Sequence, residues 1–413
     1  MSETLEIVYS GLPVQASVEL PGSKSLSNRL LILEYFSGGV IKGKEHSEAA
    51  DTLNLSEILK KKPIVADAGE GGTTSRFALT ALAATPGYVG VLKGSRRLMQ
   101  RTVSELVNAL RKLGADLTYV ESENHLPIKI VGKKLYSASI ELNGTISSQF
   151  ISALLLLGTN LPEGIEITIS GKIVSKPYLD MSIKMLRFLN FNIEENNQIY
   201  KVYPHKWIPT EVIVEKDWSS ASYWYSIVAL APKATVLLKG LNLNSFQGDR
   251  LIADIFSLLG VSTKQKEEGI LLEKTNQCVN LFTFDCIDQP DIAQTLAVTL
   301  SGLRIKGHLT GLNTLRGKET DRIEAMKHEL QKMNVKVTEP VEGELLIDAR
   351  FADFSKLVII DTYNDHRMAL SFAPLVFKVY KLAIRSPKVI EKSYPDFWKE
   401  LRKSSVSLTE WEF

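Results

Sequence analysis

A long amphipathic helix followed by two short alternating segments recurs along the chain. The clearest copies cover residues 104–131, 181–204, 250–274 and 322–348. Each helical part ends at Gly or Asn, the residue types that best tolerate the left-handed backbone that closes a helix: Gly114, Asn190, Gly260 and Asn334. These positions are 76, 70 and 74 residues apart (114 to 190, 190 to 260, 260 to 334). The pattern therefore predicts a repeated α/β module.

A second kind of helix is apolar nearly all round, which is typical of a helix buried between other elements. Its four examples cover residues 146–158, 219–232, 290–302 and 365–377, and each has Ser or Asp within its first two residues. Such residues cap helices and attract ligands there. No long Pro/Ser-rich or low-complexity tract interrupts the pattern, so we expect closely coupled domains with the chain crossing between them.

Composition narrows the function classes. The 413 residues are 44% hydrophobic and 23% charged, as in ordinary globular proteins of two or three domains. A net charge of +2 gives no basic field for nucleic acid or an anionic membrane. Two cysteines and six scattered histidines, with no CxxC or HExxH motif, suggest neither disulfides nor a metal. Without a signal peptide or an apolar run of membrane-spanning length, we expect a cytoplasmic chain.

The stretch PGSKSLSNRLLIL, residues 21–33, joins a small-residue loop to a helix with a leucine stripe. Lys24, Ser25 and Arg29 lie at its start, where free N–H groups and the helix dipole already attract anions. The pattern is compatible with a phosphate or carboxylate site. It is also compatible with a capping Ser and two solvated cations.

Three more clusters occur in the first half. The Gly-rich turn 69–72 precedes a helix that carries Arg76, and Gly72 would let a ligand approach the backbone. Arg101 belongs to a basic segment before another helix, which opposes the dipole unless an anion is present. Ser147, Ser148 and Gln149 begin the helix at 146–158 and could bind hydroxyls or phosphate, or serve as simple caps.

The second half carries acids together with cations. The segment RGKETDRIEAM contains Lys318, Glu319 and Arg322, and Asp291 begins the helix at 290–302. The segments YNDHRMAL and EKSYPDF supply Arg367 and Lys392. Either acid could simply stabilise the first turn of its helix. Taken together with the cations of the first half, the pattern implies two anionic ligands and one or two proton-transfer groups.

These motifs, in this order and over essentially the whole chain, resemble the 5-enolpyruvylshikimate-3-phosphate synthase family. The segments that match are LPGSKSLSNR, GGTTSR, RLMQRTVSELVNALRKLGA, SSQFISALL, SKPYLDMS, PDIAQTLA, KETDRIEAM, YNDHRMAL and KSYPDF. The resemblance implies two similar domains, each of three βαβαββ repeats around a pseudo-threefold axis (an inside-out α/β barrel). It assigns residues 21–216 to one domain and residues 1–20 plus 217–413 to the other, with the active site in the interdomain cleft.

The resemblance also implies a reaction. The enolpyruvyl group of phosphoenolpyruvate would move to the 5-hydroxyl of shikimate 3-phosphate, with release of phosphate, by addition and elimination and without cofactor or metal. The shikimate 3-phosphate site would comprise Lys24, Ser25, Arg29, Ser147, Ser148, Gln149, Ser175, Tyr178, Asp291 and Lys318. The phosphoenolpyruvate site would comprise Lys24, Gly72, Arg101, Gln149, Arg322, Arg367 and Lys392.

Lys24, Asp291 and Glu319 would be the catalytic residues. We expect a monomer that closes around its ligands, because the like-charged cations would repel one another in the free state. Glu70, Phe77 and Thr102 depart from the usual family pattern of Asn, Pro and Pro, which bears on substrate affinity and on sensitivity to the family inhibitor glyphosate. Two alternatives are UDP-N-acetylglucosamine enolpyruvyl transferase, which has a different loop pattern, and a non-catalytic anion-binding relative.

Overall fold

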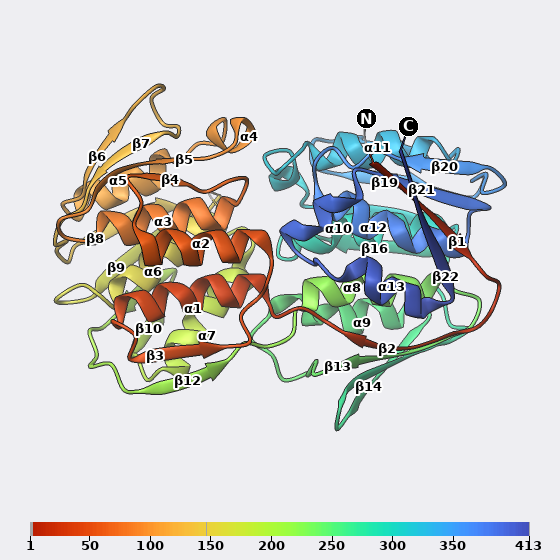
Figure 1. Ribbon diagram of the computed structural model, residues 1–413, viewed down its shortest axis with the longest axis horizontal. Helices are drawn as coiled ribbons and strands as arrows, with labels where there is room; N and C mark the ends of the chain where they lie inside the picture. Colours follow the sequence, from red (N-terminus) through yellow and green to blue (C-terminus); the bar gives the residue numbers. More distant parts are fainter. Residues whose placement is uncertain (1–2, 146, 413) are drawn as a thin grey trace. The chain divides into compact units, whose positions relative to one another are not determined.

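The computed structural model describes residues 3–145 and 147–412, and its chain divides into two compact units (Figure 1). Unit 1 comprises Met1–Pro21 and Glu215–Phe413, and unit 2 comprises Gly22–Val214. The two N-terminal strands therefore belong with the C-terminal half of the chain.

Unit 2 alternates helices and short strands. Its helices are α1 (Lys24–Phe36), α2 (Ala50–Lys61), α3 (Gly72–Ala83), α4 (Arg96–Met99), α5 (Ser104–Lys112), α6 (Ser148–Gly158) and α7 (Lys176–Phe188). Its strands are β3 (Ile41–Lys44), β4 (Val65–Asp67), β5 (Val89–Lys93), β6 (Asp116–Tyr119), β7 (Ile128–Val131), β8 (Ser139–Asn143), β9 (Ile165–Ser170), β10 (Ile193–Asn196), β11 (Ile199–Val202) and β12 (Thr210–Ile213).

Unit 1 has the same alternation. Its α-helices are α8 (Trp218–Leu230), α9 (Ile252–Ser257), α10 (Ala293–Gly302), α11 (Arg322–Gln331), α12 (His366–Phe372) and α13 (Phe397–Leu401). Its strands are β1 (Glu3–Tyr9), β2 (Val14–Glu19), β13 (Ala234–Lys239), β14 (Val261–Lys266), β15 (Gly269–Lys274), β16 (Leu281–Asp285), β17 (Lys306–Thr310), β18 (Lys336–Thr338), β19 (Leu345–Asp348), β20 (Leu357–Ile360), β21 (Lys381–Arg385) and β22 (Val406–Glu412). Short 3₁₀ helices lie at η1 (Gly248–Leu251), η2 (Pro290–Ile292), η3 (Asn313–Leu315), η4 (Ala373–Phe377), η5 (Pro387–Lys392) and η6 (Arg402–Ser404).

One sheet pattern repeats in both units. In unit 2, β4–β5–β7–β6 and β8–β9–β11–β10 each have one parallel pair followed by two antiparallel pairs. In unit 1, the sheets β16–β17–β19–β18, β2–β13–β15–β14 and β20–β21–β1–β22 follow the same pattern. The pair β3–β12 retains only the parallel contact. The predicted βαβαββ repeat is confirmed by this topology.

Each unit places helices inside and sheets outside. In unit 2, α1, α3 and α6 pack against one another, and in unit 1 α8, α10 and α12 do so. These helices are buried nearly all round, whereas strands such as β8 alternate buried and exposed residues. Hydroxyl groups join the central helices of unit 1, because Thr295 Oγ1 lies 3.2 Å from both Ser222 Oγ and Ser371 Oγ.

The predicted helix ends are confirmed. Gly114, Asn190, Gly260 and Asn334 all have positive φ, at 94°, 65°, 85° and 56°. The expected caps are only partly correct. Ser147 and Asp365 cap α6 and α12, but α8 begins one residue after Asp217, which caps it in place of Ser219. Asp291 lies in the 3₁₀ turn η2, so it does not cap α10.

Candidate active site

The start of α1 positions a cation in unit 2. Ser23 is the helix cap, and Lys24 is the first helical residue. Lys24 Nζ lies 3.0 Å from Asp51 Oδ2, in the first turn of α2, and both side chains are mostly buried. Lys24 is therefore not the solvated cation that one interpretation of this segment suggested. Sequence reasoning missed Asp51; its only local signal is an acid at the start of a helix.

Arg29 is buried, with 3% of its surface exposed, and its guanidinium donates to neutral oxygens of the described residues. Nε donates to Ser182 Oγ at 2.7 Å, and Nη2 donates to Ser152 Oγ at 3.2 Å and to the Tyr178 carbonyl at 2.7 Å. Nη1 donates to the Ser25 carbonyl at 2.8 Å. Within residues 3–145 and 147–412, no carboxylate lies within ion-pair distance of it, and burial lowers its pKa to about 10. This buried positive charge favours an anion nearby.

The Gly-rich turn brings the backbone of α3 against Arg101. A Cβ atom at Gly72 would lie 2.8 Å from Arg101 Nη1, so a larger residue at this position would displace the guanidinium. Arg76 is different: it is buried inside α3 and donates to the Gly72 carbonyl at 3.1 Å and to Ser75 Oγ at 2.9 Å. We therefore assign Arg76 a structural role.

The starts of α6 and α7 supply neutral polar groups. Ser147 Oγ accepts from the Gln149 amide at 3.3 Å. Gln149 Nε2 donates to Thr73 Oγ1 at 2.9 Å, beside the Gly-rich turn. Ser148 is buried, and Ser175 precedes α7 in the left-handed conformation, with φ of 54°. Tyr178 contributes its backbone carbonyl, as described for Arg29.

The three residues that depart from the usual pattern of the resembled family lie in different environments. Phe77 is buried, and the Arg29 guanidinium lies 5.8 Å from the centre of its ring. Thr102 Oγ1 accepts from the Ser104 amide at 3.4 Å at the start of α5. Glu70 is half-buried in the turn that precedes α3.

In unit 1, Arg322 is the centre of a buried ion cluster. Its Nε donates to Asp365 Oδ2 at 2.7 Å, and its Nη2 donates to Glu319 Oε2 at 2.8 Å. Its Nη1 lies 3.5 Å from Asp291 Oδ1. The side chain of Arg322 is 2% exposed and that of Asp365 is 0% exposed. Burial alone would lower the pKa of Arg322, but Asp365, Glu319 and Asp291 outweigh it and raise the pKa.

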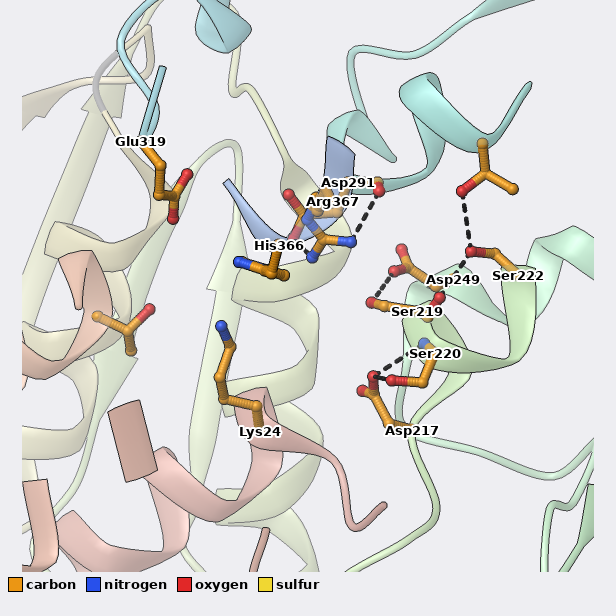
Figure 2. Close-up of polar contacts among 12 residues, drawn as sticks. Lys24, Asp217, Ser219, Ser220, Ser222, Asp249, Asp291, Glu319, His366 and Arg367 are labelled. Carbon is orange, nitrogen blue, oxygen red and sulfur yellow. Dashed lines mark hydrogen bonds and ion pairs between the residues drawn. The ribbon is translucent and has the colours of Figure 1, made fainter. Parts of the chain in front are cut away.

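Arg367 contacts the other carboxylate oxygen of Asp291, and Figure 2 shows the two residues together. Its Nη2 lies 2.8 Å from Asp291 Oδ2, and its Nη1 donates to the Asp291 carbonyl at 2.9 Å. Burial would raise the pKa of Asp291, but Arg367, Lys318 and Arg322 hold it well below its ordinary value. Asp291 is thus an ionised carboxylate at neutral pH.

These ion pairs bear on the expected repulsion among the cations. The cations were expected to repel one another in the free state, but Lys24 pairs with Asp51, and Arg322 and Arg367 pair with acids of their own unit. Lys392 Nζ donates to the Asn364 carbonyl at 2.6 Å. Closure around the ligands stays a prediction.

A second acidic group, Asp217 and Asp249, lies near Asp291 and was missed by sequence reasoning. Asp217 Oδ2 accepts from the Ser220 amide at 2.9 Å and from its hydroxyl at 2.7 Å. Ser219 Oγ donates to Asp249 Oδ2, as Figure 2 shows. Burial, with the nearby charge of Asp291, raises the pKa of Asp249 to about 7. The local signal was the acid–hydroxyl segment DWSS followed by QGD.

The structure therefore brings Asp291, Glu319, Arg322 and Arg367 into one cluster of unit 1. It brings Gly72 against Arg101, and Ser25, Tyr178 and Arg29 together, within unit 2. Among the described residues, no group of three or more His, Cys, Asp or Glu side chains is arranged to hold a metal ion. No helix within residues 3–145 and 147–412 is both long and apolar enough to span a bilayer.

Comparison with known proteins agrees with this architecture. The sequence profile described as EPSP synthase (3-phosphoshikimate 1-carboxyvinyltransferase) matches residues 38–401. A 3-phosphoshikimate 1-carboxyvinyltransferase of Bacteroides fragilis is 39% identical, over 96% of both chains. One of Haemophilus influenzae is 33% identical, over 94% of this chain and 96% of its own.

Solved structures show the same fold. An EPSP synthase of Acinetobacter baumannii aligns with 99% of this chain and all of its own, at a TM-score of 0.77 and 19% identity. The enolpyruvyl transferase NikO of Streptomyces tendae covers 100% of this chain and 99% of its own, at a TM-score of 0.74 and 13% identity. The predicted fold class is confirmed.

Proposed function

The chain belongs to the EPSP synthase family, and we propose on that basis that it is a 3-phosphoshikimate 1-carboxyvinyltransferase of aromatic amino acid biosynthesis. It transfers the enolpyruvyl group of phosphoenolpyruvate to the 5-hydroxyl of shikimate 3-phosphate and releases phosphate. The observation that carries the proposal is the cluster in which Arg322 joins Asp291, Glu319 and Asp365. A buried acid–arginine group of this kind can both bind an anion and exchange protons.

Unit 2 supplies the shikimate 3-phosphate site. Arg29 attracts the anionic substrate because its buried charge has no carboxylate partner among the described residues. The residues that we propose for binding this substrate are Lys24, Ser25, Arg29, Ser147, Ser148, Gln149, Ser175, Tyr178, Asp291 and Lys318.

The phosphoenolpyruvate site is rich in arginine because a guanidinium binds carboxylate and phosphate through two parallel hydrogen bonds. Its residues are Lys24, Gly72, Arg101, Gln149, Arg322, Arg367 and Lys392. Because Gly72 has no side chain, the Arg101 guanidinium lies against the backbone at the start of α3, where we propose that the substrate binds.

Three residues carry the chemistry. Asp291, which is ionised, accepts the proton of the 5-hydroxyl as its oxygen bonds to C2 of phosphoenolpyruvate. Glu319 gives a proton to the methylene carbon, which completes the tetrahedral adduct. Elimination then breaks the C2–O bond beside Lys24. The phosphate leaves with the proton that Asp291 accepted, and Glu319 recovers a proton from the methyl group. Because the carbon returns to an enol ether, no net oxidation occurs. We further propose that the enzyme acts as a cytoplasmic monomer, which sedimentation and localisation would test.

Phosphate release tests the proposal. The purified protein is mixed with phosphoenolpyruvate and shikimate 3-phosphate, and each substrate is omitted in turn. We expect release only when both are present. Release with UDP-N-acetylglucosamine in place of shikimate 3-phosphate would indicate the sister enzyme. A folded protein that binds both substrates but releases no phosphate would be a non-catalytic relative, and Glu70→Asn would show whether that acid blocks the site.

A further inference from the structure

The loop between β20 and α12 has an unusual backbone. Tyr363 and Asn364 both have positive φ, at 52° and 57°. Asn tolerates this conformation, but a bulky aromatic residue rarely adopts it. The other consecutive pair of described non-glycine residues with positive φ, Asn197 and Gln198, forms the turn of the hairpin β10–β11, where such angles are ordinary. Residues 363–364 lie in no hairpin, so other contacts must hold them.

A buried carboxylate supplies those contacts. Glu329 lies on α11, and its side chain is 0% exposed. Its Oε1 accepts from the Tyr363 hydroxyl at 2.7 Å. Its Oε2 accepts from the Asp361 amide at 3.1 Å and lies 2.7 Å from Lys332 Nζ. Both oxygens of Glu329 are therefore occupied, and two of the three donors belong to the loop.

The same loop leads directly into the candidate site. Asp365, which follows Asn364, binds Arg322 and caps α12, and Arg367 comes two residues later. The Asn364 carbonyl accepts from Lys392. A change in the backbone at residues 363–364 would therefore move both Arg367 and the acceptor that holds Lys392.

We propose that Tyr363 and Glu329 form a clamp that positions Arg367 and Lys392 for binding the phosphoenolpyruvate anion. Tyr363 is a positioning residue, and its phenolic oxygen is not required to touch substrate. Burial and the Glu329 carboxylate raise the pKa of Tyr363, so its hydroxyl stays a donor throughout the neutral range. The clamp rests on the proposed function for the identity of the anion, but its contacts do not depend on that identity.

The test compares Tyr363→Phe with Tyr380→Phe. Tyr380 is 73% exposed, and it offers the same chemical change elsewhere in unit 1. We expect Tyr363→Phe to raise KM for phosphoenolpyruvate about three- to tenfold, the effect of one lost hydrogen bond. We expect kcat, its pH profile and KM for shikimate 3-phosphate to stay unchanged. Hydrogen exchange of the amides of residues 361–367 should become faster, and Tyr380→Phe should change none of these quantities.

A double-mutant cycle with Glu329→Gln checks that the two side chains act through one contact. If they do, the double variant should bind phosphoenolpyruvate no worse than Glu329→Gln alone. An unchanged KM for phosphoenolpyruvate in Tyr363→Phe, or an equal rise for both substrates, would overturn the clamp. If the wild-type protein releases no phosphate, the proposed function fails. Hydrogen exchange then still decides, because unchanged exchange at residues 361–367 in Tyr363→Phe would overturn the clamp.

Discussion

Arg322 and Asp365 form a fully buried pair: Nε of the arginine lies 2.7 Å from Oδ2 of the aspartate, and neither side chain is more than 2% exposed. The same guanidinium reaches Glu319 and Asp291. Glu319, which we expect to protonate the methylene carbon, and Asp291, which we expect to accept the hydroxyl proton, thus contact the same guanidinium. Replacing that cation should change stability as well as activity.

Arg322→Ala should lower the free energy of unfolding by about 3–5 kcal/mol, because it leaves buried carboxylates without a partner. Arg322→Lys keeps the charge but loses the planar fork, so it should lose less stability and still raise KM for phosphoenolpyruvate. Urea unfolding and steady-state kinetics measure both effects. Arg350→Lys is the control, since Arg350 pairs with Asp348 on the surface. Equal stability losses at positions 322 and 350 would contradict the role of Arg322 as the centre of the buried ion cluster.

Glu319→Gln should reduce kcat by about 10²–10⁴-fold, the usual contribution of a general acid or base. The amide oxygen can still accept from Arg322, so the fold should persist. Phosphate release at saturating substrates measures the change. Glu324→Gln is the matched control because Glu324 lies on α11 and its side chain is 54% exposed. Near-normal turnover in Glu319→Gln would remove this residue from the proton transfer.

Gly72→Ala should lower kcat/KM for phosphoenolpyruvate by about ten- to a hundredfold, because the new methyl group displaces the Arg101 guanidinium. Stability should change little, since the atom that must move is the end of a flexible side chain. Shikimate 3-phosphate binding, measured by calorimetry, should be retained. If KM for phosphoenolpyruvate stays at the wild-type value, Arg101 is not part of that site.

Asp249→Asn should flatten the pH dependence of stability between about pH 4 and about pH 7. The pKa of Asp249 rises from 3.8 to about 7 in the folded protein, so folding takes up a proton in this interval. This carboxyl therefore contributes stability at low pH that is lost as pH rises through its folded pKa. The opposing dependence of Asp291, whose pKa is lowered, should remain.

Urea unfolding at several pH values measures the slope in both proteins. The groups that influence Asp249 are Asp291, Asp217, Arg367 and the Ser219 hydroxyl, so the variant must retain them. An unchanged slope in Asp249→Asn would show that Asp249 ionises normally in the folded state.

Local sequence determined much of the fold. The helix ends at Gly114, Asn190, Gly260 and Asn334 follow from a backbone preference of single residues, and all four adopt the left-handed conformation. The apolar helices could be recognised because periodicity acts within one or two turns. The clusters of cations near helix starts could be recognised because their members are close together in the sequence.

Only the tertiary structure decided the partners. Lys24 pairs with Asp51 of the next helix, Tyr363 binds Glu329, which lies 34 residues earlier, and Asp249 binds Ser219, which lies 30 residues earlier. No local rule specifies such pairs, because they depend on how helices pack around the centre of each unit. The charges of the neighbouring residues then decide the ionisation of two buried aspartates. Cations hold the pKa of Asp291 low against the effect of burial, whereas burial and the charge of Asp291 raise the pKa of Asp249.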